Sequence, residues 1–367
     1  MRLFFELLQV AMGNRQELSH TPDAGEWQEM YDVACKQAIA GICADGIGIL
    51  PKEQQPPKDI AMRWAMTAVC IDKQNRRLNR QAVKIQEKFR NAGFRSCIFK
   101  GQGIAAAYYP KPLHRQSGDI DIWFEGSRKR IISYVRSISP NETVSYHHID
   151  FKILKYPSVE IHFFPSYLNN PFRNRRLLAY WREETARQME NRITLPEDAG
   201  TITAPTDNFN LIAILVHIHH HYFEEGIGLR QLADYYHILA SGIDEYIKAD
   251  VRRKLKAFGM MKFAGAVMYV LQKVFGMKDD CLLLPPQEKT GKLLLTHVMA
   301  SGNFGKYDKK VRRIYQSGTP LSRFIRRERF NLRIFMQYPE EYFSEIYFRV
   351  FYYFYRKRWN GRCAQIY

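Results

Sequence analysis

The chain lacks several features that would assign it to a specialised class of protein. Its six cysteines are scattered and none forms a CxxC pair, which argues against a zinc ribbon or a disulfide framework and favours reduced thiols in the cytoplasm. No run of about 18 apolar residues is present, so we expect no transmembrane segment. The opening apolar stretch is interrupted by Glu6 and Gln9 and lacks a small-residue cleavage site, so we expect a helix there rather than a signal peptide.

Acidic residues are the scarcer charge. Lys and Arg number 55 against 37 Asp and Glu, which gives a net charge of +18. The excess is uneven, because the segment between Lys306 and Arg362 holds 15 basic and 5 acidic residues. A basic tail of this kind suggests contact with a polyanion such as RNA. The aromatic residues of 343–354 recur at helical spacing, which favours instead a tail that packs as core.

The order of apolar and polar residues predicts an α+β fold with three regions. A helical N-terminal region precedes a core built on a small mixed sheet, and a helical C-terminal region follows it. We predict the boundaries of these regions at residues 1–93, 94–200 and 201–367. Within the core, the last two predicted strands flank a hairpin turn at Tyr156-Pro157-Ser158. The strands are expected at FRSCIFKG (94–101), DIDIWFE (119–125), IDFKILKY (149–156) and VEIHFF (159–164).

The longest predicted helix covers residues 58–91. Met62, Met66 and Val69 recur in it at helical spacing with basic residues on the other side, which predicts that they form its buried face. The glycine of Asn91-Ala92-Gly93 provides a C-cap signal.

Two aspartates stand two residues apart in the stretch SGDIDIW. Asp119 and Asp121 alternate with Ile120 and Ile122, so on a strand the two carboxylates share one face, roughly 6.6 Å apart along the strand. Two anions this close repel each other unless a cation lies between them. The stretch therefore predicts a metal site.

Phosphate-binding features precede these aspartates. A strand ends in Lys100-Gly101, Gly103 opens a short helix, and the next loop carries Arg115 and Ser117. Glycines at a helix N-terminus let the backbone approach a phosphate, and basic side chains add positive charge. Paired carboxylates hold Mg²⁺, which usually shares its ligands with substrate phosphates. Together these features suit nucleotidyl transfer with two metal ions.

The stretch from Lys100 to Ile122 resembles the DNA polymerase β-like nucleotidyltransferase superfamily. It is most similar to an uncharacterised nucleotidyltransferase family with the pattern KG…YP…R…GDIDL. The resemblance implies a polymerase β-like core and a third carboxylate on a later strand, for which Glu160 is the best candidate and Asp150 the rival. The commoner turn of the superfamily is Gly-Ser, whereas this chain has Lys-Gly-Gln-Gly, which leaves the role of Lys100 open.

The resemblance implies Mg²⁺-dependent transfer of a nucleoside monophosphate from an NTP to an acceptor hydroxyl. The acceptor stays open among RNA, a protein and a small molecule. The alternative is a protein of the same fold that binds nucleotide or a partner without turnover. Asp119, Asp121 and Glu160 would hold two Mg²⁺ ions, and Glu160 would help deprotonate the acceptor. The triphosphate would be bound by Lys100, Gly101, Gly103, Arg115, Ser117 and Arg230.

A histidine-rich stretch, HIHHHYF, lies in a predicted helix. His217 and His221 stand four residues apart and would suit a metal pair, but no HExxH motif or suitably spaced third ligand accompanies them. Partly buried helix histidines are the plainer interpretation. The resembling family has a similar helix before LRQL.D, which implies that Arg230 and Asp234 face the catalytic cleft.

Overall fold

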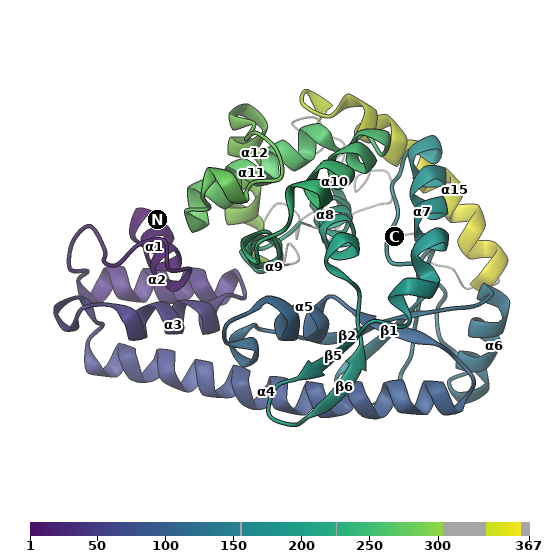
Figure 1. Cartoon of the computed structure of the whole chain (residues 1–367), viewed down its shortest axis with the longest axis horizontal. Coiled ribbons are helices and arrows are strands. Elements are labelled where there is room, and N and C mark those ends of the chain that lie inside the picture. Colours follow the sequence, from purple (N-terminus) through teal and green to yellow (C-terminus); the bar gives the residue numbers. More distant parts are fainter. Residues whose placement is uncertain (155, 225, 304–334, 361–367) are drawn as a thin grey trace, which may run out of the picture. The chain divides into compact units, whose positions relative to one another are not determined.

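The structure, a computed structural model, describes residues 1–154, 156–224, 226–303 and 335–360. The chain divides into two units, each assembled from segments far apart in the sequence (Figure 1). The predicted division into three consecutive regions stays a prediction. Unit 1 comprises Met1–Arg77, Tyr108–Ser117 and His221–Gln316, and unit 2 comprises Leu78–Ala107, Gly118–His220 and Ser317–Tyr367.

Unit 1 is helical in the part of it that the structure describes. Its second helix begins with a capping box in which the side chains and backbone of Asp23 and Glu26 satisfy each other. Helices are predicted at 229–240, 243–258, 260–275 and 287–300, and each is confirmed to within a few residues at its ends. The helices of this unit are α1 (Arg2–Ala11), α2 (Ala24–Lys36), α3 (Ala40–Ile49), α9 (Leu229–Ala240), α10 (Glu245–Ala257), α11 (Met261–Phe275) and α12 (Glu288–Ser301).

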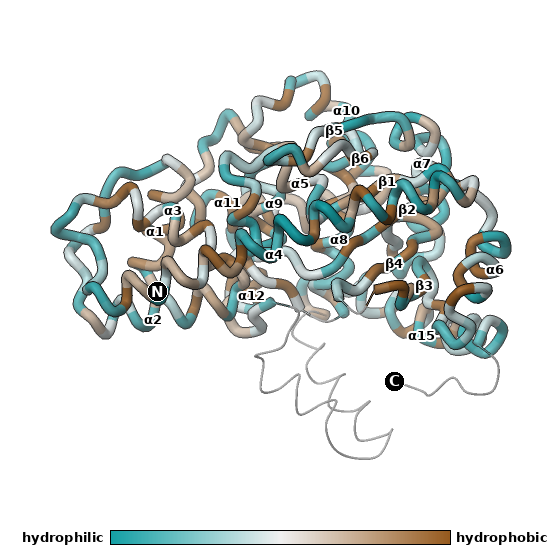
Figure 2. Tube along the Cα trace, turned by 90° about the horizontal axis from the view of Figure 1, so that it is seen from below, coloured by the Kyte–Doolittle hydropathy of each residue, from teal (hydrophilic) through white to brown (hydrophobic). Residues whose placement is uncertain are grey.

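The long predicted helix is confirmed as α4 (Lys58–Asn91), but its predicted buried face is wrong. Met62, Met66 and Val69 are between 63% and 65% exposed. The core residues lie on another face, because this helix carries apolar residues on two sides and only packing decides between them. Figure 2 shows hydrophobic and hydrophilic residues alternating along the whole helix. The buried apolar residues of α4 are Ile60, Trp64, Ala68, Ile71, Leu78, Ala82, Ile85 and Phe89.

A four-stranded mixed sheet organises unit 2, which confirms the α+β class. The strand order is β1-β2-β4-β3, with β2 parallel to β4 and the other two pairs antiparallel. Short helices are predicted at 104–109 and 128–138, and they are confirmed as α5 (Gly101–Tyr108) and α6 (Arg128–Ile138), which follow β1 and β2 respectively. The strands are β1 (Ser96–Phe99), β2 (Asp119–Phe124), β3 (His148–Asp150) and β4 (Ser158–His162).

The sheet has one apolar face and one mixed face. On the apolar face, Ile120 and Ile122 of β2 and Ile161 of β4 pack in a core with Ile85 and Phe89 of α4. Alternation along each strand places the acidic residues of β2 and β4 on the opposite face. The apolar alternation thus fixes which side of the sheet can hold charge.

Aromatic residues cover part of the mixed face. Trp123 of β2 stacks on Phe209 of α8 (Asp207–Glu224), with ring centroids 5.5 Å apart. Phe209 in turn contacts Trp181 of α7 (Pro171–Gln188) at 4.9 Å. One end of β2 is therefore packed on this face, and the acidic residues lie toward the other end.

Three details of unit 2 differ from the sequence prediction. The predicted strand over 149–156 is confirmed only as β3, which ends at Asp150, although β3 and β4 do form an antiparallel pair. A second small sheet was not predicted; it pairs β5 (Arg192–Leu195) with β6 (Gly200–Thr203). The side chain of Gln86 on α4 bonds backbone groups of both Ser96 and Thr203, and so links β6 to β1.

Most of the basic tail lies outside the described residues, as does the helix predicted after Pro320. Helix α15 (Pro339–Asn360) is described, and it corrects the predicted packing of the aromatic face. Phe343 and Phe354 are 61% and 63% exposed, whereas Phe348 is buried against Tyr167, with ring centroids 4.8 Å apart. Aromatic residues occur all around this helix, so their spacing alone cannot identify its buried side.

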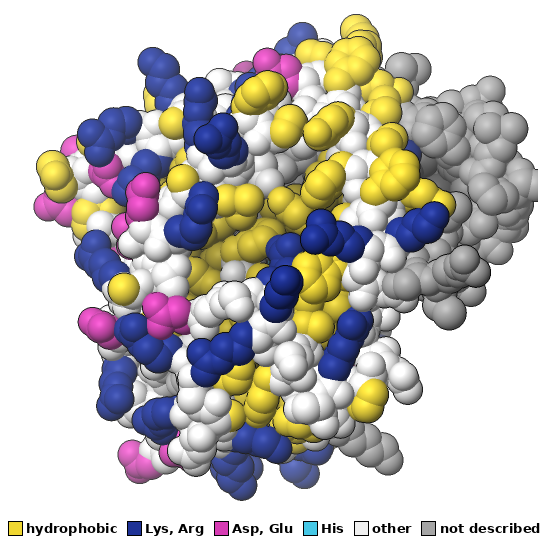
Figure 3. Space-filling view, turned by 90° about the vertical axis from the view of Figure 1, so that its right-hand side faces the viewer, with side chains coloured by type: hydrophobic (Ala, Val, Ile, Leu, Met, Phe, Trp, Pro, Cys, Tyr) yellow, Lys and Arg dark blue, Asp and Glu magenta, His cyan; other side chains and the backbone are white. Residues whose placement is uncertain are grey.

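Positive side chains predominate on the face of the molecule shown in Figure 3, where Lys and Arg outnumber Asp and Glu and alternate with hydrophobic patches. This view agrees with the net charge of +18. Among the described residues, no helix is both long enough and apolar enough to cross a membrane.

Candidate active site

Two acidic residues meet in unit 2 because their strands are hydrogen-bonded neighbours. β2 and β4 run parallel, and their register pairs Asp121 with Glu160. Paired residues on neighbouring strands project to the same face of a sheet. The structure thus brings together two of the three predicted metal ligands, on the face opposite Ile120 and Ile161.

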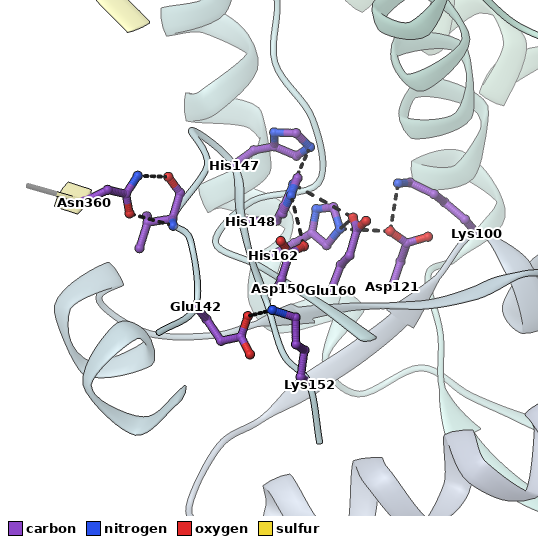
Figure 4. Close-up of polar contacts among 11 residues, drawn as sticks. Lys100, Asp121, Glu142, His147, His148, Asp150, Lys152, Glu160, His162 and Asn360 are labelled. Atoms are coloured by element: carbon purple, nitrogen blue, oxygen red, sulfur yellow. Dashed lines mark hydrogen bonds and ion pairs between the residues drawn. The ribbon is translucent and has the colours of Figure 1, made fainter. Parts of the chain in front are cut away.

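Asp121 is neutralised by the protein's own positive charge. Lys100 Nζ lies 3.1 Å from Asp121 Oδ1, and His162 Nε2 lies 2.9 Å from the same oxygen (Figure 4). His162 is fully buried and also approaches Glu160 Oε2 at 3.3 Å. One imidazole therefore contacts both carboxylates.

Further titratable groups extend this cluster along the β3–β4 pair. His148 Nδ1 lies 3.9 Å from Glu160 Oε2 and 3.2 Å from His147 Nε2. On its other side, His148 Nε2 lies 3.8 Å from Asp150 Oδ1. Figure 4 shows these side chains pointing toward one another from the ends of the two strands.

The carboxylates stay ionised although Asp121 is buried and Glu160 is half-buried. Burial alone raises the pKa of Asp121, but the nearby Lys100 charge and the His162 hydrogen bond outweigh burial and hold the pKa well below its ordinary value. Burial also raises the pKa of Glu160. The hydrogen bond with His162 and the charge of the neighbouring His148 outweigh burial, so the pKa of Glu160 is lowered overall. Both groups are therefore anionic ligands at neutral pH.

In the outer members of the cluster, the pKa shifts favour the neutral form instead of the charged form. Burial lowers the pKa of His148 to about 4, against a partial compensation by Glu160. Burial likewise holds the pKa of His147 well below its usual range. Burial raises the pKa of Asp150, and the charge of Glu160 adds to this. His147 and His148 are therefore neutral imidazoles at pH 7.

The donor set fits a divalent cation. Ligand atoms of Asp121, Glu160 and His162 all lie within 4.8 Å of one another. Both contacts of Asp121 end on Oδ1, so Oδ2 accepts no hydrogen bond in the part of the chain that the structure describes. A hard cation such as Mg²⁺ prefers oxygen ligands of this kind.

Asp119 occupies the predicted face but a different position along it. It begins β2 and pairs in register with Ser158, two residues before the Asp121–Glu160 pair. Three close sets of metal-binding side chains are found among the described residues. One of them contains both Asp121 and Glu160, and none contains Asp119. Its role as a ligand stays a prediction.

The predicted phosphate turn links β1 to α5. Lys100 has a positive φ of 60°, a left-handed conformation that is uncommon for a residue other than glycine. A Cβ added at Gly103 would lie 3.0 Å from the carbonyl oxygen of Ile98, so packing of α5 on β1 accounts for this glycine. A Cβ at Gly101 would make only an ordinary 3.8 Å contact. The phosphate role of both glycines stays a prediction.

The other predicted phosphate ligands belong to unit 1. Arg115 donates two hydrogen bonds of 2.6 Å to the two carboxylate oxygens of Asp234, and a third of 2.8 Å to Ser117 Oγ. Tyr109 Oη donates to Asp234 at 2.7 Å. Arg230 donates to the backbone oxygen of Gln116 at 3.0 Å. Arg115 and Asp234 therefore form a bidentate, buried ion pair.

Paired carboxylates beside a lysine on a small mixed sheet define a site that suits a cation and a phosphate. A comparison with protein-family models agrees: residues 23–276 match the model of the uncharacterised nucleotidyltransferase family. The match covers more than half of the chain, so the chain belongs to this family. A search of curated proteins returned no match.

Sequence reasoning missed two of the clustered residues. His147 directly precedes β3 and His148 begins it, whereas the strand predicted over 149–156 starts one residue too late to include either. The signal that could have found them is the alternation in VEIHFF, which places His162 on the face of Glu160. In contrast, His217 and His221 of α8 are absent from the close sets of metal-binding side chains in the described part of the chain.

Proposed function

We propose that this protein transfers a nucleoside monophosphate from an NTP to an acceptor hydroxyl with the help of Mg²⁺. The observation that carries the proposal is the register of β2 and β4, which sets Asp121 beside Glu160 and Lys100 at the end of the neighbouring strand. The family to which the chain belongs supports nucleotidyl transfer in general. We further propose that the core of unit 2 is polymerase β-like.

Asp119, Asp121 and Glu160 are the residues that would hold the metal. When bound, Mg²⁺ would neutralise charge on the phosphates and the attacking oxygen. Two ions need more oxygen ligands than the close pair of carboxylates can provide, so the proposal requires Asp119 in addition to Asp121 and Glu160. His162 holds Asp121 and Glu160 in place through its two contacts.

The reaction exchanges one phosphorus–oxygen bond for another. The acceptor oxygen attacks the α-phosphorus, the bond to the β-phosphate breaks, and pyrophosphate leaves. The acceptor proton passes to Glu160, whose side chain is 29% exposed and ionised, so it can be reached and can accept a proton. A positioned base of this kind contributes about 10²–10⁴-fold.

Lys100 would supply positive charge for the leaving pyrophosphate. Its side chain is 13% exposed, and its ammonium now lies on Asp121. A cation bound by Asp121 would take over this neutralising role and allow Lys100 to bind phosphate instead. We propose the same ligand role for the backbone of Gly101 and Gly103 at the N-terminus of α5.

The ion pair of unit 1 suggests a different role for Arg115. Its guanidinium already donates to both oxygens of Asp234, and the two side chains are 4% and 5% exposed. We therefore assign Arg115 to the stability of unit 1. Phosphate binding by Ser117 and Arg230 stays a prediction.

A labelling experiment tests the function and identifies the substrates. The full chain is incubated with each of the four α-³²P-labelled NTPs, Mg²⁺ and cell extract, and the label is followed into RNA, protein and small-molecule fractions. We expect one fraction to acquire label, with a preference for one NTP. Tight NTP binding without label in any fraction would contradict transfer and favour the non-catalytic alternative.

A further inference from the structure

The cluster in unit 2 contains more nitrogen ligands than the proposed transfer uses. Three imidazoles, those of His147, His148 and His162, have ligand atoms within 4.8 Å of one another. The contacts around them form a series of donor atoms, in which Glu160 Oε2 lies 3.3 Å from His162 Nε2 and 3.9 Å from His148 Nδ1. The series of donor atoms ends with His147 Nε2, which lies 3.2 Å from His148 Nδ1.

The imidazole rings of His147 and His162 have the same orientation relative to the cluster. Nε2 of both His147 and His162 faces the cluster, whereas Nδ1 of each ring is buried with no hydrogen-bond partner among the described residues. The backbone holds the set in place, because β3 pairs His148 with His162 and the carbonyl of His147 accepts from Phe163 N at 2.8 Å. The three imidazoles thus meet at one end of the β3–β4 pair (Figure 4).

We infer that His147, His148 and His162 form a binding site for a divalent transition-metal ion such as Zn²⁺. The contact of 3.2 Å between two imidazole nitrogens is close to the edge of a tetrahedron with metal–nitrogen bonds of about 2.0–2.1 Å. Three imidazoles with a fourth position left open are a ligand set that zinc takes readily.

This site differs in chemistry from the carboxylate site beside it. Imidazole ligands favour zinc and its neighbours, whereas Mg²⁺ requires oxygen ligands. Asp121 provides carboxylate oxygens at one side of the cluster, and the imidazoles of His147 and His148 provide nitrogens at the other. Glu160 lies between them, with Oε2 3.3 Å from His162 Nε2 and 3.9 Å from His148 Nδ1. The transition-metal site can exist whether or not the chain transfers nucleotides.

Calorimetric titration of Zn²⁺ into the metal-free full chain tests the inference directly. We expect one Zn²⁺ to bind per chain, and millimolar Mg²⁺ not to displace it. The tested variants are His147→Gln and His148→Gln, because glutamine is polar and similar in size to histidine but lacks the imidazole ligand. Each should weaken Zn²⁺ binding by about 100-fold or more, beyond the 10–100-fold typical of losing a supporting partner.

The matched control is His20→Gln, because His20 also contacts a carboxylate, Glu26, at 3.1 Å but lies outside the cluster. It should bind Zn²⁺ as the wild type does. Far-ultraviolet circular dichroism confirms that each variant is folded, and the visible bands of Co²⁺ report tetrahedral coordination independently.

Two outcomes would overturn the inference. One is a folded wild-type chain that binds no Zn²⁺. The other is Zn²⁺ binding that survives in both histidine variants and is lost only in Asp121→Asn, which would place the ion on the carboxylates. Because no nucleotide is present, Zn²⁺ binding without nucleotidyl transfer would leave this site standing and refute only the proposed function.

Discussion

Unit 1 and unit 2 each bury an aspartate beside a basic side chain, but the two sites are bonded in different ways. In unit 1, both oxygens of Asp234 are held by Arg115 at 2.6 Å, and Tyr109 adds a third hydrogen bond. In unit 2, Lys100 and His162 both bind one oxygen of Asp121. Both oxygens of Asp234 thus already accept hydrogen bonds, whereas Asp121 keeps Oδ2 for a further ligand.

Exposure follows the same contrast. The side chains of Arg115 and Asp234 are 4% and 5% exposed, so water and ligands are excluded from the pair. In unit 2, exposure rises from His162, which is fully buried, through Glu160 at 29% to Asp150 at 51%. The buried Arg115–Asp234 ion pair therefore suits a role in stability. The partly exposed side chains of the unit 2 cluster suit ligand binding and catalysis.

The largest expected effect comes from Asp121→Asn. Loss of this ligand should reduce nucleotidyl transfer by roughly 10³-fold or more, because metal stabilisation of the transition state is worth several kcal/mol. The melting temperature should also fall, because Lys100 and His162 lose their charged partner, so rates are compared per folded molecule. Initial rates of label transfer provide the measurement.

Asp45→Asn is the matched control for Asp121→Asn. Asp45 also accepts from a lysine and a histidine, Lys111 and His114, each at 2.8 Å, but it lies in unit 1. Its variant should transfer label at the wild-type rate. An equal loss of activity in both variants would contradict the special role of Asp121.

Asp234→Ala should have the largest effect on stability. It leaves the buried guanidinium of Arg115 without its partner, which typically costs about 3–5 kcal/mol. Urea denaturation of the full chain measures the loss. Replacing both partners with apolar residues of similar size should recover part of it.

The same experiment separates the two roles considered for Arg115. If Arg115→Met lowers the free energy of unfolding while kcat/KM per folded molecule is kept, the structural role holds. A folded Arg115→Met chain with a large rise in KM for the NTP would instead restore the predicted phosphate contact.

Glu160→Gln should reduce turnover by about 10²-fold, toward the lower end of the range for a general base. NTP binding should change far less, because the base acts in the transition state. Asp150→Asn is the rival variant and should keep turnover near the wild-type level. The reverse pattern would make Asp150 the base and the assignment of Glu160 wrong.

The smallest expected effect is the loss of stability at acidic pH that comes from His237. Burial lowers the pKa of His237 to about 4, and its ring lies 4.0 Å from that of Tyr109 in the closed network of unit 1. The unfolded chain protonates this histidine near its ordinary value of about 6.5, so the unfolded state holds more protons between pH 6.5 and 4. The free energy of unfolding should therefore fall as the pH drops through this window.

We expect the contribution of His237 to be about 1–3 kcal/mol at pH 7, below the full value of its shift because the ring is partly exposed. Urea denaturation at pH 7.5 and pH 5 measures it. His237→Gln should reduce the difference between the two pH values. An unchanged difference would mean that other groups carry the acid sensitivity.

The sequence predicted the part of the candidate site that depends on local pattern. Alternation in DIDIWF and VEIHFF placed Asp121 and Glu160 on polar strand faces, and the hairpin-like pairing of β3 with β4 was also recognised. These features depend on period-two spacing, which one sequence displays directly.

The parts that could not be predicted depend on distant partners. Asp234 lies 119 residues from Arg115, and no local signal joins them. For the same reason Met66 was assigned to the buried face of α4: its apolar character is visible in the sequence, but the packing that leaves it exposed is not. His147 gains its meaning only when β4 lies beside β3.

The most direct test of the central claim follows two labels at once. The full chain is incubated with the preferred NTP, labelled in separate reactions at the α- and the γ-phosphate, with Mg²⁺ and the acceptor fraction. The account predicts α-label on the acceptor and γ-label in pyrophosphate in equal amounts, both lost in Asp121→Asn and both kept in Asp45→Asn. Label from the γ-phosphate on the acceptor, or α-transfer that persists in Asp121→Asn, would contradict it.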